Sequence, residues 1–245
     1  MRKRIIMILL VLTIIVFVPK VEAKETIYYT TPNGIELTEK EYTFLTTFYW
    51  KNYVDIMTEK QYEEFKNSDL LDRRLITKTY TEKICKDRST IYSTSYKTLK
   101  ISAACSSNCS VSLVNEWTQN PTVRSYDDIG MYLSGLDLVS YTYTAIFDSN
   151  GSSSSGHFKT EYATSHDAIG SSVLLPSGSN IIVNQVITTT TGGHIFGSYQ
   201  HATQSITLPV AKSYTFSLGG YGNVFLFNGN AVGVYDGMAG VDIYV

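Results

Sequence analysis

The stretch that decides the fold is residues 139–147, which read Val139-Ser140-Tyr141-Thr142-Tyr143-Thr144-Ala145-Ile146-Phe147. Large apolar or aromatic side chains alternate here with smaller, mostly hydroxyl-bearing ones. Successive side chains of a strand point to opposite faces of a sheet, so this period of two predicts a strand with one buried face and one face wet by solvent. The same alternation occurs in residues 110–113 and 214–218.

Turn-forming residues separate such runs from one another. They occur at Asn150-Gly151, 176–180, Gly192-Gly193, 219–222, 228–230 and Asp236-Gly237. Short alternating strands at this spacing predict an antiparallel β-sandwich. We place this β-sandwich domain at residues 78–245.

The segment before the strands carries helical signals instead. Thr38-Glu39-Lys40-Glu41 fits a capping box, in which the first and last side chains each satisfy the other residue's backbone N–H. The same signal returns at residues 58–61. These signals predict two short helices, near 39–50 and 59–66, that form a helical hairpin within a small N-terminal region, 24–77. The fold class is therefore mainly β: an antiparallel β-sandwich preceded by a short helical hairpin.

The first 23 residues have the pattern of a secretory signal peptide. Three basic residues follow Met1, residues 5–18 are apolar except for Thr13, and Ala23 ends a small-x-small exit. The apolar run is shorter than the ~20 residues that a membrane-spanning helix needs. We expect a secreted, extracellular protein that begins near Lys24 and keeps no stable membrane span after cleavage. The alternative is an uncleaved N-terminal segment that tethers the protein.

The charge balance argues against nucleic acid as a partner. The whole chain has a net charge of −2, and losing residues 1–23 removes four basic residues and one acid, which changes the charge to −5. Nucleic acids and anionic membrane surfaces select clusters of Lys and Arg. A mildly acidic exported chain fits neither partner.

Three cysteines, Cys85, Cys105 and Cys109, follow the predicted signal peptide. Cys105 and Cys109 flank three turn-forming residues between two strand-like runs, so a disulfide between them is within geometric reach. An oxidising location favours such a bond. Pairing of Cys85 with one of the other two is the alternative, and three thiols without a nearby histidine are not a recognised metal-ligand set.

Catalytic and metal-binding patterns do not stand out from the background. The chain has no G-x-S-x-G elbow and no H-E-x-x-H pair, so we expect no catalytic residue, metal or cofactor. The four histidines, which we expect at the surface or in hydrogen bonds, are His157, His166, His194 and His201. The carboxylates of the β region form no diagnostic glycosidase run; they are Glu116, Asp127, Asp128, Asp137, Asp148, Glu161, Asp167, Asp236 and Asp242.

The segment 121–130 is the most distinctive of the β region. Arg124 is followed there by Asp127 and Asp128. An internal ion pair between Arg124 and one of these acids is the simpler interpretation. A polar clamp for a ligand is the functional alternative.

Four blocks of the chain carry a resemblance to known proteins. They are residues 37–42, 123–130, 199–202 and 235–242, which read LTEKEY, VRSYDDIG, YQHA and YDGMAGVD. With these blocks the chain resembles a group of small exported proteins of Gram-positive bacteria. The resemblance spans most of the exported chain and implies no activity, so no functional residue is transferred from it.

These observations favour an exported, non-enzymatic binding or surface-interaction protein. The chain has 19 tyrosines, whose rings can stack on sugars and whose hydroxyls can bond to them, so a glycan is one expected partner and a surface protein another. An exposed row of aromatic side chains would support glycan binding over ordinary strand propensity. The alternatives are a pore-forming, membrane-active protein and a secreted glycan hydrolase.

Overall fold

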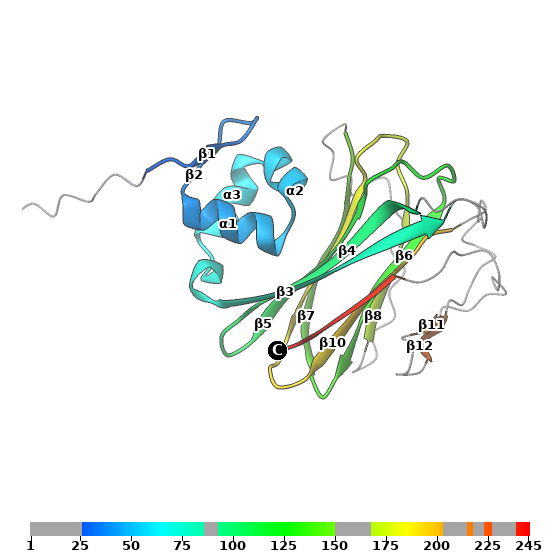
Figure 1. Ribbon diagram of the computed structural model, residues 1–245. Coiled ribbons are helices and arrows are strands. Elements are labelled where there is room, and N and C mark those ends of the chain that lie inside the picture. The colour runs from blue at the N-terminus through cyan, green and yellow to red at the C-terminus, as the bar shows by residue number, and fades with distance from the viewer. Residues whose placement is uncertain (1–25, 86–92, 150–167, 203–214, 218–222, 227–238) are drawn as a thin grey trace, which may run out of the picture.

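The computed structural model describes residues 26–85, 93–149, 168–202, 215–217, 223–226 and 239–245. The predicted signal peptide lies outside these residues, and so do His157 and His166. The described part is mainly β, with a short helical segment before the long strands (Figure 1). Among these residues, no helix combines the length and the apolar character that crossing a bilayer would require.

Two antiparallel sheets form the body of the protein, which confirms the predicted β-sandwich. The five-stranded sheet has the order β3 (Arg74–Cys85), β4 (Ser93–Cys105), β5 (Cys109–Trp117), β9 (Ile182–Thr189) and β7 (Leu138–Phe147). The four-stranded sheet has the order β13 (Ala239–Tyr244), β10 (His194–Gln200), β6 (Tyr126–Ser134) and β8 (Ala168–Leu174). A separate short pair joins β11 (Thr215–Ser217) and β12 (Asn223–Leu226).

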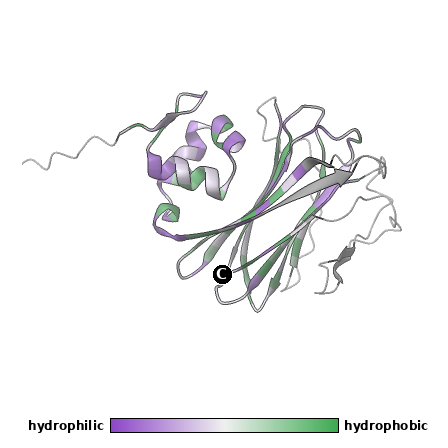
Figure 2. Ribbon diagram, in the orientation of Figure 1, coloured by the Kyte–Doolittle hydropathy of each residue, from purple (hydrophilic) through white to green (hydrophobic). Residues whose placement is uncertain are grey.

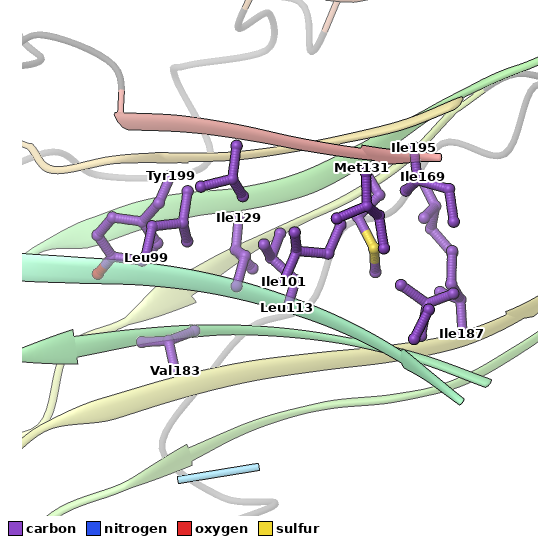
Figure 3. Close-up of a cluster of buried hydrophobic side chains, with 14 of the residues drawn as sticks. Leu99, Ile101, Leu113, Ile129, Met131, Ile169, Val183, Ile187, Ile195 and Tyr199 are labelled. Carbon is purple, nitrogen blue, oxygen red and sulfur yellow. The ribbon is translucent and has the colours of Figure 1, made fainter. Parts of the chain in front are cut away.

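The main core lies between the two sheets (Figure 3). Leu99, Ile101 and Leu113 from the five-stranded sheet meet Ile129 and Met131 from the four-stranded sheet, and all five are almost fully buried. Hydrophobic and hydrophilic positions follow one another along these strands in Figure 2, as a period of two requires. Burial of this apolar face is the main stabilisation of the sandwich.

The disulfide between Cys105 and Cys109 closes the β4–β5 hairpin. The two residues are direct partners in the ladder, with Cα atoms 4.1 Å apart, and both sit in the main core. The structure therefore confirms the pairing predicted from the sequence. Cys85 is the last residue of β3.

The helical region contains three helices rather than the predicted two. They are α1 (Glu39–Phe48), α2 (Lys51–Ile56) and α3 (Glu59–Lys66), and they lie between the short pair β1 (Tyr29–Thr30) and β2 (Glu36–Leu37) and the 3-10 turn η1 (Leu70–Asp72). The chain leaves the helical conformation at Tyr49 and Trp50, and α2 starts after Trp50 without any side-chain cap. A helix that starts without a cap gives no sequence signal, so the prediction of one helix over 39–50 was wrong in this detail.

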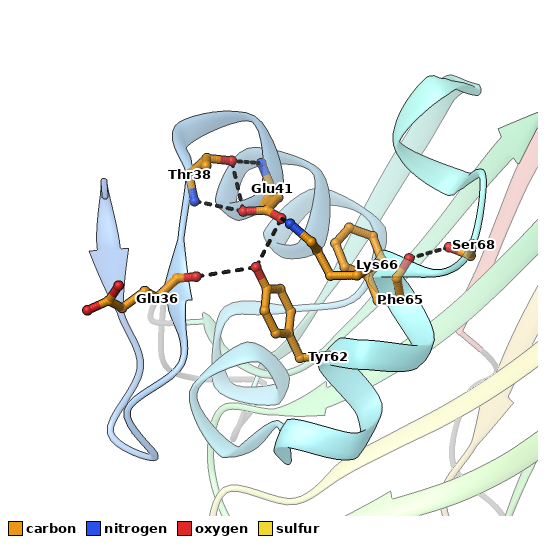
Figure 4. Close-up of polar contacts among 7 residues, drawn as sticks. All are labelled: Glu36, Thr38, Glu41, Tyr62, Phe65, Lys66 and Ser68. Atoms are coloured by element: carbon orange, nitrogen blue, oxygen red, sulfur yellow. Dashed lines mark hydrogen bonds and ion pairs between the residues drawn. The ribbon is translucent and has the colours of Figure 1, made fainter. Parts of the chain in front are cut away.

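Both predicted capping boxes are present. Thr38 Oγ1 accepts from the Glu41 backbone N–H at 3.3 Å, and the Glu41 carboxylate accepts from the Thr38 backbone N–H at 2.8 Å (Figure 4). Thr58 and Gln61 make the same reciprocal pair at the start of α3. Glu41 also accepts from Tyr62 on α3, so the first capping box ties two helices together.

The helices cover the outer face of the five-stranded sheet. A second apolar cluster joins Leu45, Phe48 and Val54 of the helices to Val114 and Ile182 of the sheet. The sequence predicted that each sheet leaves a hydroxyl-bearing face to solvent, and for this sheet that prediction was wrong. Ser102 and Ser112, which lie on this face, are fully buried.

The buried polar groups of this face serve the helix that covers them. Ser102 Oγ donates to the Thr47 carbonyl at 2.9 Å, and Lys100 Nζ donates to the Thr46 carbonyl at 3.1 Å. The last carbonyls of an α-helix have no partner within the helix. Two side chains of β4 therefore satisfy the C-terminal end of α1.

Candidate functional site

A cavity of about 530 Å³ lies between the helical region and β7. Ligand sites for small molecules have volumes of roughly 300 to 1,000 Å³ and mostly apolar walls with a few polar groups. Apolar side chains form much of this wall: Leu45, Met57, Phe65, Leu70, Ala145 and Phe147. Eight polar residues complete the site: Tyr49, Tyr53, Gln61, Glu64, Ser68, Thr142, Tyr143 and Thr144.

A β-bulge in β7 aims Tyr143 at this cavity. The register of β7 against β9 shifts between Tyr141 and Tyr143. As a result Tyr141 packs against the main core between the sheets, whereas Tyr143 lines the cavity on the helix side. The strict alternation predicted for residues 139–147 would place both rings on one face, and this prediction was wrong. Bulges re-aim side chains in this way and occur often beside functional sites.

The break between α1 and α2 positions the other two tyrosines. Tyr49 caps the C-terminal end of α1, and Tyr53 lies in the first turn of α2. Their rings stack with centroids 4.5 Å apart, and Tyr53 meets Phe147 of β7 edge-on at 5.0 Å. The tyrosine pair thus joins the helices to the strand that forms the opposite wall.

The hydroxyls of Tyr49, Tyr53 and Tyr143 remain protonated in the ordinary pH range. Burial raises the pKa of Tyr53 to about 12, and burial also raises the pKa values of Tyr49 and Tyr143 above the ordinary value of 10. A protonated phenol can both donate and accept a hydrogen bond. The cavity therefore offers neutral hydrogen-bonding groups rather than phenolate charge.

The hydroxyl of Tyr143 is buried without a hydrogen bond of acceptable geometry to the described residues. The hydroxyls of Tyr49 and Tyr53 lie close enough to interact with it and influence its pKa, although neither makes a hydrogen bond of acceptable geometry to it. A buried donor without a partner costs roughly 1 to 3 kcal/mol. A ligand that offers an oxygen or nitrogen at this position would recover that energy.

One charged group belongs to the cavity wall among the described residues. Glu64 on α3 contributes a carboxylate, and none of the described lining residues is Lys or Arg. Glu64 lies 3.7 Å from Lys60 Nζ, and both side chains are mostly exposed. Burial is the main cause of the raised pKa values of Tyr49 and Tyr53, and the negative charge of Glu64 adds to it.

Sequence reasoning did not find this site. The tyrosines were visible only as part of an abundant residue type, and no local pattern marked a bulge after Tyr141. The spacing of Tyr49 and Tyr53, four residues apart, was the available signal for stacked rings. This spacing indicates a site only once the tertiary structure shows that the break between α1 and α2 lies beside β7.

The segment around Asp127 forms a buried structural cluster instead of a ligand clamp. The Asp127 carboxylate is fully buried and accepts from Tyr199 Oη, from the Ala202 backbone N–H and from Nδ1 of His201. Arg124 donates to the Pro176 carbonyl at 3.1 Å, so the expected ion pair with Asp127 or Asp128 is not the contact it makes. Of the two described histidines, His201 is thus hydrogen-bonded and His194 is at the surface.

The outer face of the four-stranded sheet carries a short aromatic row. Ring centroids lie 6.0 Å apart for Tyr132 and Phe196, 5.9 Å for Phe196 and His194, and 5.0 Å for His194 and Tyr244. His194 and Tyr244 are exposed, whereas Phe196 is buried. The exposed part of the row is therefore limited to one edge of the sheet.

No protein-family model matches this chain, and no curated protein sequence matches it. Among solved structures, a chain from a study of pH-induced modulation of Streptococcus parasanguinis adhesion by Fap1 fimbriae resembles it with a TM-score of 0.37 and 14% sequence identity. The similarity covers 70% of this chain and 95% of that chain. At this level of similarity the comparison carries no functional argument.

Proposed function

We propose that this protein is an exported, non-enzymatic binding protein that holds a saccharide in the cavity between its helices and β7. One observation carries the proposal. The buried hydroxyl of Tyr143 makes no hydrogen bond of acceptable geometry to the described residues, and Tyr143 belongs to the wall of a cavity of ligand size. A group of this kind is costly unless something binds to it.

The chemistry of the wall supports a saccharide. Sugars offer hydroxyl and ring oxygens to hydrogen-bonding side chains, and their C–H faces pack on aromatic rings. The cavity supplies both kinds of contact, with the hydroxyl of Tyr143, the amide of Gln61 and the rings of Tyr53 and Phe65. A protein partner at the surface is the alternative, and nucleic acid does not fit the charge of the chain.

The number of carboxylates in the cavity wall supports binding rather than hydrolysis. Hydrolysis of a glycosidic bond usually needs two carboxyl groups that flank the bond. The described wall supplies one, Glu64. The proposal that the protein is exported rests on the basic start and apolar run of residues 1–23.

The test is a saccharide-binding screen followed by titration of the hits by calorimetry. Tyr143→Phe should weaken binding about threefold to tenfold, the effect of one lost hydrogen bond. The variant should fold as the parent does, because phenylalanine keeps the ring and the deleted hydroxyl makes no hydrogen bond of acceptable geometry. Tyr132→Phe, on the outer face of the other sheet, is the matched control and should bind as the parent does.

Two results would reject this proposal. One is that no saccharide in the screen binds. The other is that Tyr143→Phe binds every hit as tightly as the parent. Turnover of a bound saccharide that is lost in Glu64→Gln would instead show that the protein is an enzyme.

A further inference from the structure

The charge of the cavity narrows the class of saccharide. The described wall has one carboxylate, Glu64, and no cationic side chain to balance it inside the cavity. Lys60, the partner of Glu64, is mostly exposed and does not line the cavity. A ligand that carries a negative group would meet an unfavourable field, and a ligand that carries a positive group would meet a favourable one.

The aromatic side chains of the cavity wall also favour a positively charged ligand. The faces of tyrosine and phenylalanine rings attract cations, and burial of the site strengthens that attraction. Tyr53, Phe65 and Tyr143 line the cavity, and burial keeps the two phenols neutral. Their oxygens can accept hydrogen bonds from an ammonium group.

Glu64 is placed to act on the ligand rather than on the fold. Its side chain is 65% exposed, and its ion pair with Lys60, a residue of the same helix, is a loose one at 3.7 Å. Such a surface pair contributes little to stability. Glu64 nevertheless lines the same cavity as Tyr49 and Tyr53.

We infer that the cavity selects an amino sugar with a free, protonated amine, with Glu64 as the residue that determines this preference. The inference rests on the proposed saccharide-binding function and names its ligand class. In the expected arrangement, the amine lies at the Glu64 side of the cavity and a ring hydroxyl or ring oxygen meets Tyr143 Oη.

The test uses three sugars that share one ring: glucosamine, N-acetylglucosamine and glucuronic acid, with galactosamine and N-acetylgalactosamine as a second pair. Affinities are measured by calorimetry with the full protein at pH 6, where the free amine is protonated. We expect the amino sugar of at least one pair to bind about threefold to fivefold more tightly than its acetylated form, and glucuronic acid to bind most weakly. Added salt should weaken binding of the amino sugar more than binding of its acetylated form.

Glu64→Gln should remove the preference for the amine, because glutamine keeps the size of the side chain and loses its charge. Glu63→Gln is the matched control, because Glu63 is exposed on the same helix and does not line the cavity. Lys60→Met should strengthen amino-sugar binding, because it leaves the Glu64 charge without its partner.

Failure of this inference can be distinguished from failure of the proposed saccharide-binding function. If sugars bind with no preference for the amine, or if Glu64→Gln weakens both members of a pair equally, the inference is wrong and the saccharide site stands. If none of the five sugars binds and the saccharide screen also gives no hit, the proposed function fails and the inference fails with it. Binding of other saccharides but of none of these amino sugars overturns the inference alone.

Discussion

The hydroxyl of Tyr199 on β10 donates a hydrogen bond of 2.5 Å to the carboxylate of Asp127 on β6, across 72 residues of chain. Trp117 Nε1 of the other sheet donates to the same hydroxyl at 3.2 Å. Asp127 thereby connects the two sheets through a chain of buried polar groups. Segments 123–130 and 199–202, which the sequence marked separately, meet at this point.

Asp127→Asn should destabilise the protein by about 1 to 3 kcal/mol. The amide can accept with one oxygen only, so at least one of the three buried donors loses its partner. Urea denaturation of the parent and the variant measures the change in the free energy of unfolding. Asp137→Asn, at an exposed carboxylate, is the control and should change stability by less than about 0.5 kcal/mol.

Glu41→Gln should lower stability at neutral pH by about 1 to 3 kcal/mol, although glutamine preserves the capping box, as Gln61 does in α3. Burial raises the pKa of Glu41, but hydrogen bonds from Thr38, Lys66 and Tyr62 outweigh it and lower the pKa overall. This contribution is present above the unfolded-state pKa near 4.5 and is lost as the pH falls through the lower folded-state value. The stability gap between parent and variant should therefore shrink in acid. A gap that stays constant from pH 7 to pH 3 would contradict this account.

Lys100→Met should flatten the pH dependence of stability in the alkaline range. Burial lowers the pKa of Lys100 from 10.5 to about 7, and the nearby charge of Glu116 only partly opposes this. Between these two values the unfolded chain binds more protons than the folded one, so the stability of the parent rises with pH over this window. Denaturation at pH 6, 8 and 9.5 should show this rise in the parent and a smaller one in the variant. Lys40→Met, at an exposed lysine, should keep the parent's slope.

Thr38→Ala and Thr58→Ala should each cost about 1 kcal/mol, because each removes the hydroxyl that accepts from the first turn of its helix. Thr43→Ala in the middle of α1 replaces an exposed threonine with a better helix former and should be neutral or slightly stabilising. Thermal unfolding of the three variants ranks their stabilities. Equal effects of Thr38→Ala and Thr43→Ala would argue against the cap at α1.

Features that depend on neighbouring residues were determined by the sequence itself. The reciprocal caps at Thr38 and Thr58 need only four consecutive residues, and the disulfide between Cys105 and Cys109 needs only a short turn. The alternation of side chains in the strands is equally local, and with the spacing of turns it was enough to predict the sandwich. In each case the chemistry that forms the structure lies within a few residues of the chain.

Features that depend on two distant segments were decided by the tertiary structure. The outward serines of β4 and β5 are buried because helices cover them, and Ser102 finds its partner in the carbonyl of Thr47, 55 residues away. Tyr143 faces the cavity because the ladder with β9 shifts by one position after Tyr141, and a strand's own alternation cannot show where its partner slips. The candidate site lies at that slip and at the uncapped helix break opposite it. Its residues become neighbours only through pairings between segments far apart in the chain.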